Sequence, residues 1–193
     1  SSLSGPSSSF TVNGTLDAGT FIINGGATNG SFILASGATL KSSNTNGIVS
    51  TTVGTISNTI ANRTFNDAAN YEFYGGAAVT NTSFPNSVMN NLTISNTAGV
   101  TQGGAITVNG NLTIASGAAF TTSANAIGLK GNWVNNGGTL TPSNTVTLNG
   151  TSAQSYTNTR TNTFNNLTLN NANGLLLNNN SNVGSPLTLT AAK

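Results

Sequence analysis

Short runs of alternating apolar and polar residues recur along the whole chain, and many of them place a Thr between two aliphatic residues. Asn-Gly, Gly-Gly and Ser-Gly pairs separate these runs. An alternation with a period of two is typical of a β-strand with one buried face, and the glycine-containing pairs are typical of turns. The pattern therefore predicts an all-β protein with many short strands, among them Phe10–Val12, Phe21–Ile23, Phe32–Leu34, Leu92–Ile94, Ile106–Val108, Leu112–Ile114, Val146–Leu148, Leu167–Leu169 and Leu187–Leu189.

These strands return at a regular distance. Ile106–Val108, Ile127–Leu129 and Val146–Leu148 follow one another at about 20 residues, and Leu92 and Leu112 keep the same spacing. A period near 20 with short strands and small turns predicts a right-handed parallel β-solenoid of nine or ten coils. The alternative is an antiparallel β-sandwich whose Asn-Gly turns close hairpins, but the recurrence favours the solenoid.

A longer internal repeat has an offset of 75 residues and aligns Met89–Ile94 with Phe164–Leu169 without a gap. No domain boundary is evident, so we expect one solenoid domain over residues 10–193. Residues 1–9 are small and polar, and we expect them to form a flexible N-terminal arm or linker. The Thr/Ser-rich stretch Asn46–Asn62 still alternates apolar and polar residues, and this predicts additional coils there.

The amino-acid composition excludes several classes of function. The 193 residues include 33 Asn, 32 Thr and 22 Ser, whereas charged residues make up 4% and His and Cys are absent. Without His or Cys the chain cannot build Ser-His-Asp triads, cysteine nucleophiles or the common zinc sites. Five scattered cations give no footprint for nucleic acid, and no apolar run is long enough to span a membrane. We expect no enzyme activity and no cofactor.

Stacked coils would place Asn over Asn and Thr over Thr, so that uncharged side chains bond along the axis. Stacked like charges would instead repel each other, which accounts for the scarcity of charge. Natural solenoids carry polar caps at their ends, and neither end of this sequence offers one. We therefore expect the ends to associate with other copies of the chain or with covalently neighbouring repeats.

Candidate chemistry is sparse. The three acids are Asp17, Asp67 and Glu72, of which the last two lie near Arg63; we interpret them as surface charges rather than as an acid–base pair. The aromatic residues Tyr71, Phe73, Tyr74 and Trp133 could form a platform that contacts a glycan. Their alternation with polar residues favours packing in the core.

Three segments resemble large secreted surface proteins of Bacteroidota. They are Ser36–Ile48, Arg63–Gly76 and the run from Met89 to Thr113, which contains Ile106-Thr107-Val108-Asn109-Gly110-Asn111-Leu112. The family comprises adhesin-like, repeat-rich proteins exported by the type IX secretion system. The resemblance implies a β-solenoid stalk or adhesive segment and no catalytic residues.

Together these observations predict an extracellular, non-catalytic structural protein on a bacterial surface, either a stacking rod or filament subunit or an adhesin stalk. The alternative is a carbohydrate-binding adhesive module that contacts surface glycans through Tyr71, Phe73, Tyr74 or Trp133.

Overall fold

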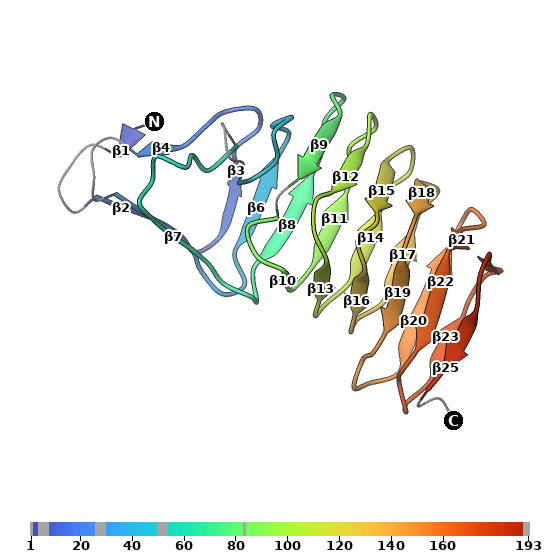
Figure 1. Ribbon diagram of the computed structural model, residues 1–193. Coiled ribbons are helices and arrows are strands. Elements are labelled where there is room, and N and C mark those ends of the chain that lie inside the picture. The colour runs from blue at the N-terminus through green and yellow to red at the C-terminus, as the bar shows by residue number, and fades with distance from the viewer. Residues whose placement is uncertain (1, 4–7, 26–29, 50–53, 83, 191–193) are drawn as a thin grey trace.

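The chain winds as a parallel β-solenoid of about 8 turns with roughly 21 residues per coil. The structure is a computed structural model that describes residues 2–3, 8–25, 30–49, 54–82 and 84–190. Figure 1 shows the coils following one another from the N-terminus to the C-terminus, so the order of the chain is also the order in space. Every pairing between the described strands is parallel. This confirms the predicted solenoid, and the antiparallel sandwich is wrong.

Each complete coil contributes one strand to each of three faces. Face 1 contains a three-stranded sheet, β2-β5-β7, and a six-stranded sheet, β10-β13-β16-β19-β22-β25. The bounds are β2 Ser9–Val12, β5 Ser31–Leu34, β7 Asn62–Phe65, β10 Val88–Met89, β13 Ile106–Val108, β16 Ile127–Leu129, β19 Thr145–Leu148, β22 Asn166–Leu169 and β25 Leu187–Leu189.

Face 2 is one continuous eight-stranded sheet with the order β3-β6-β8-β11-β14-β17-β20-β23. At a strand spacing of about 4.8 Å this sheet is roughly 34 Å long. Its strands are β3 Thr15–Asp17, β6 Thr39–Ser42, β8 Asn70–Phe73, β11 Leu92–Ile94, β14 Leu112–Ile114, β17 Trp133–Asn135, β20 Gln154–Asn158 and β23 Leu175–Leu177.

Face 3 is interrupted and forms three sheets, β1-β4, β9-β12-β15-β18 and β21-β24. The bounds are β1 Ser2–Leu3, β4 Asn24–Gly25, β9 Val79–Thr82, β12 Val100–Gln102, β15 Ala119–Ser123, β18 Thr139–Pro142, β21 Thr163–Phe164 and β24 Asn182–Val183. Within the predicted N-terminal arm, β1 pairs with β4, whereas residues 1 and 4–7 lie outside the described part of the chain.

The core lies inside the coils because alternate strand residues point inward. On face 2 the parallel register stacks one inward column of side chains from coil to coil: Leu16, Leu40, Tyr71, Leu92, Leu112, Trp133, Tyr156 and Leu177. The six members between Leu16 and Leu177 are at most 2% exposed. Each ring or aliphatic group therefore covers its neighbour's apolar surface, and burial of that surface drives the coils together.

Asparagine connects the coils at the corner that precedes face 2. The backbone N–H of Asn111 donates to Asn91 Oδ1 at 2.7 Å, that of Asn132 to Asn111 Oδ1 at 2.9 Å, and that of Ser155 to Asn132 Oδ1 at 2.8 Å. The predicted asparagine ladder is therefore present, but these three bonds run from backbone to side chain. Amide-to-amide bonding occurs at Asn70, which accepts from the Nδ2 atoms of Asn90 and Asn91.

The coil count of nine or ten was too high, because the Asn46–Asn62 stretch does not form whole coils. It makes an excursion between β6 and β7 whose described part adds to face 3 alone: Ile56 bridges Ile23, and its N–H donates to the carbonyl of Ile48. Ile48, Ile56 and Ile60 are buried, which explains the apolar alternation. Residues 50–53, including Val53, lie outside the described residues.

The 75-residue repeat relates different faces. Leu92–Ile94 lies in β11 on face 2, whereas its match, Leu167–Leu169, lies in β22 on face 1. At roughly 21 residues per coil, an offset of 75 is not a whole number of coils, so the repeat moves each strand onto another face. The unit that recurs in the sequence is therefore one strand with its turn.

Candidate functional site

The aromatic residues predicted as glycan contacts lie mostly inside the solenoid. Tyr71, Phe73 and Trp133 are each at most 1% exposed, and Trp133 packs against Tyr156 and Phe164 at centroid distances of 6.4 and 5.0 Å. A buried ring cannot stack on a sugar, so the packing interpretation holds for these three. Only Tyr74 reaches the outer surface, where it is partly exposed.

Tyr74 belongs to a charged cluster on the outside of face 2. Its hydroxyl donates to Asp17 Oδ1 at 2.6 Å, and Lys41 Nζ lies 5.3 Å from the centre of its ring. Lys41 also lies 3.2 Å from Glu72 Oε2 and 3.9 Å from Asp17 Oδ2, and Ser95 Oγ donates to Glu72 Oε1. The strands β3, β6 and β8 place Asp17, Lys41 and Glu72 side by side in register.

The electrostatics of this cluster favour a structural role. The hydrogen bond to Glu72 and the charge of that carboxylate raise the pKa of Lys41, and the hydrogen bond to Asp17 raises the pKa of Tyr74. Lys41 therefore stays charged and Tyr74 stays neutral at physiological pH. Both carboxylates already accept hydrogen bonds, so the cluster holds the first three strands of face 2 in register.

The predicted surface group of Asp67, Glu72 and Arg63 is separated in the structure. Glu72 pairs with Lys41, whereas Asp67 accepts a hydrogen bond from Asn86 Nδ2 at 3.1 Å. Among the described residues, Arg63 forms no ion pair with either acid, and no group of three or more potential metal-ligating side chains occurs there.

Four of the five exposed large hydrophobic residues in the described part of the chain lie at the C-terminal end. The fifth, Phe21, is 80% exposed and lies just before β4, where the predicted strand Phe21–Ile23 does not form beyond the single bridge at Ile23. Leu176, Leu177, Leu187 and Leu189 are 56–63% exposed, while Leu175 is partly buried. Leu187 and Leu189 are paired with the inward-facing Leu167 and Leu169, and Leu177 is paired with buried Tyr156. The side chains of Leu177, Leu187 and Leu189 therefore point toward the interior of the last coil, as does that of Leu175. We call these four leucines the C-terminal end surface.

The N-terminal end presents strands in the same arrangement. Its outermost strands are β2 on face 1, β3 on face 2 and β1 on face 3, while those of the C-terminal end are β25, β23 and β24 on the same three faces. Phe10 in β2 and Leu16 in β3 are partly buried against the core. Because all strands run parallel, each face could continue across a junction between a C-terminal and an N-terminal end.

The leucines of the C-terminal end surface were not among the candidate residues predicted from the sequence. The alternating pattern alone could have identified Leu187 and Leu189 as inward-facing residues of a terminal strand.

Among the described residues, none forms a helix of the length and apolar character needed to cross a membrane. Comparison of the chain with family models, curated proteins and solved structures finds no match.

Proposed function

We propose that the protein is a non-catalytic, extracellular structural protein of a bacterial surface, a rod segment that stacks end to end into a filament or stalk. The observation that carries the proposal is the C-terminal end surface, where inward-facing leucines remain more than half exposed. The extracellular location is supported by the sequence resemblance to secreted surface proteins.

The terminal strands are only two or three residues long, and Pro186 directly precedes β25, but they lack the charged side chains that keep many sheet edges from pairing. Natural edge strands are protected by charges, inward-pointing lysines, prolines or bulges. Here β23, β24 and β25 contain no charged residue and no proline, and residues 161–192 of the sequence contain no charge at all. Their unpaired backbone groups and leucines therefore favour the addition of another parallel strand on each face.

The occupant that fits this surface is the N-terminal end of a second copy of the chain. It presents β2, β3 and β1 in the order of faces that β25, β23 and β24 require, and it offers Phe10 and Leu16 opposite the leucines. Such a contact is heterologous, so that each subunit leaves a new C-terminal end and assembly continues as a filament.

Electron microscopy and light scattering at several protein concentrations test this proposal. We expect fibres whose axial repeat matches one subunit, roughly 38 Å for eight coils at the strand spacing. The double variant Leu187→Lys with Leu189→Lys would bury two charges at the junction, so it should stay monomeric.

Leu176→Lys is the matched control, because Leu176 is paired with Ser155 on the outer side of the sheet and its charge would remain in water. The proposal is overturned if the unmodified chain stays a monodisperse monomer at all concentrations. It is also overturned if Leu176→Lys blocks assembly as strongly as the double variant does.

A further inference from the structure

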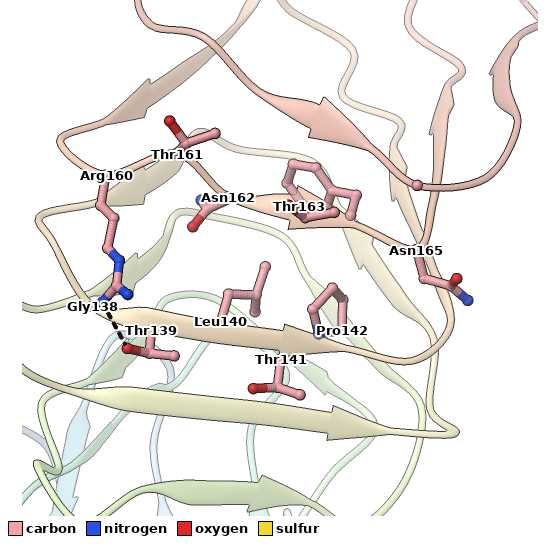
Figure 2. Close-up of a pocket in the computed structure, with 12 residues that line it drawn as sticks. Gly138, Thr139, Leu140, Thr141, Pro142, Arg160, Thr161, Asn162, Thr163 and Asn165 are labelled. Carbon is pink, nitrogen blue, oxygen red and sulfur yellow. Dashed lines mark hydrogen bonds between the residues drawn. The ribbon is translucent and has the colours of Figure 1, made fainter.

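A groove opens on face 3 where the hydrogen-bonded ladder is interrupted. The four-stranded sheet ends at β18, and β21 begins a new sheet without pairing to it. The groove has a volume of about 360 Å³ and is bordered by both strands and by Arg160 (Figure 2). Its polar rim includes the exposed residues Thr139, Thr141, Thr161 and Thr163.

Buried side chains fix the wall of the groove from behind. Phe164 packs edge-on against Trp133 and Tyr156 at centroid distances of 5.0 and 5.9 Å. Asn162 accepts a hydrogen bond from Asn135 Nδ2 at 2.7 Å and donates to the hydroxyl of Tyr156 at 3.1 Å. Because these contacts hold β21 in place, the groove is preformed, as small-molecule sites usually are.

Arg160 supplies the charge of the groove. Its Nη1 donates to Thr139 Oγ1 at 3.0 Å, across the groove as Figure 2 shows. No carboxylate of the described residues pairs with it, and the sequence contains no acid after Glu72. The remaining N–H groups of an exposed, fork-shaped guanidinium are therefore available to a carboxylate from outside.

The rest of the lining suits a sugar ring. Leu140 and Pro142 are partly exposed and rise from β18 toward β21 (Figure 2), so that they offer an apolar surface to the C–H groups of a ring. The threonine hydroxyls around them can both donate and accept hydrogen bonds, which matches the hydroxyl groups of a saccharide.

Two other ligand classes fit less well. A peptide strand inserted between β18 and β21 would need about two strand spacings, close to 10 Å, whereas Cα atoms of these strands approach within 8 Å. A nucleic acid requires several cations along its backbone, and Arg160 is the only charged residue that lines the groove.

We propose that the groove between β18 and β21 binds an acidic saccharide, with Arg160 holding the carboxylate of a uronic acid unit and Leu140 and Pro142 contacting its ring. This site lies on the side of the rod, so it is independent of end-to-end assembly.

Titration calorimetry with uronic acid oligosaccharides tests the site. The panel contains trigalacturonate, trimannuronate and a hyaluronan tetrasaccharide, and fully methyl-esterified trigalacturonate is the neutral control. We expect saturable binding of at least one acidic member, with binding at least about tenfold weaker when the carboxylates are esterified. In an NMR titration, the backbone amide signals of residues 139–141 and 160–164 should shift.

The variant Arg160→Gln should weaken binding about tenfold or more without changing the thermal unfolding temperature, because Arg160 is exposed. Lys130→Gln removes another exposed cation outside the groove lining and should leave binding unchanged. Failure of every acidic oligosaccharide to bind overturns the inference. Equal binding of the methyl ester, or an equal loss in both variants, also overturns it.

Discussion

Asparagine side chains supply hydrogen bonds that the corners of the coils would otherwise lack. Asn96 is fully buried; its Nδ2 donates to the carbonyls of Tyr74 and Ala77, and its Oδ1 accepts from the backbone N–H groups of Ala98 and Gly99. At a later corner the Oδ1 of Asn135 also accepts from two backbone N–H groups, those of Gly137 and Gly138, while its Nδ2 donates to the carbonyl of Gly138 and to Asn162 Oδ1. A buried backbone group without a partner is costly, so these residues allow sharp turns inside a closed coil.

Tyr71 is the opposite case, because its buried hydroxyl has no hydrogen-bond partner among the described residues. Burial raises its pKa, with a smaller contribution from the charge of Asp67. Below the ordinary tyrosine pKa of about 10, Tyr71 is neutral in both the folded and the unfolded state. Above it the unfolded chain loses the proton and the folded chain keeps it, so the free energy of unfolding falls as the pH rises.

Tyr71→Phe should therefore reduce the loss of stability between about pH 9 and pH 11. At neutral pH the variant should be as stable as the unmodified chain or up to about 2 kcal/mol more stable, because it removes an unpaired polar group. Urea unfolding at a series of pH values measures both effects. Tyr156→Phe is the control: its hydroxyl accepts a hydrogen bond from Asn162, and its loss should destabilise the protein. A Tyr71→Phe variant with unchanged alkaline sensitivity would contradict the argument.

Among the elements, the strands and their coil period could be predicted from the sequence. Ile106–Val108, Ile127–Leu129 and Val146–Leu148 form β13, β16 and β19 in consecutive register, because a fixed recurrence of inward-facing residues is what stacking requires. The face of each strand could not be predicted, since one strand and its turn recur three times per coil and look alike on every face.

The groove between β18 and β21 also could not be predicted from the sequence. Trp133 is paired with Tyr156, 23 residues later, whereas Leu112 is paired with Trp133 at 21 residues. Such a small change in spacing does not reveal which face will lose its hydrogen bonds. The hydrogen-bonded ladder of face 3 ends at β18, and a new sheet begins at β21.

The close contact between the corners of successive coils can be tested at a glycine. Gly131 lies between β16 and β17, and its N–H donates to the carbonyl of Gly110 at 3.1 Å. A Cβ atom at this position would overlap that carbonyl oxygen. Gly131→Ala should therefore separate two coils locally and destabilise the protein by about 1–3 kcal/mol in urea unfolding.

Gly104→Ala is the control, because a Cβ atom there would meet no heavy atom within 4 Å. We expect its effect to stay within about 0.5 kcal/mol. If the two variants are equally stable, the corner tolerates a wider spacing than the structure indicates.

For the whole molecule, stacking means that each coil touches only its neighbours. Stability is then close to a sum of coil and junction contributions, and a terminal coil with one neighbour opens more easily than a central coil with two. We expect amide hydrogens of β23 and β25 to exchange faster than those of β14 at concentrations where the protein is monomeric.

Hydrogen exchange followed by mass spectrometry measures this difference. Raising the concentration into the assembled range should slow exchange in β23 and β25 and leave β14 unchanged. Uniform protection along the chain would instead mean that the solenoid opens as one cooperative unit.

The coils follow one another in chain order, so an uneven distribution of charge along the sequence is also an uneven distribution along the axis of the rod. Residues 1–72 contain three acids, Asp17, Asp67 and Glu72, and two cations, Lys41 and Arg63, so their net charge is −1. The residues after Glu72 contain three cations, Lys130, Arg160 and Lys193, and no acid, so their net charge is +3. The rod therefore carries an electric dipole along its axis, negative toward the N-terminus. Head-to-tail neighbours attract each other and parallel neighbours side by side repel. Since salt screens charges beyond about 8–10 Å, this polarity selects orientation at contact rather than guiding rods from a distance.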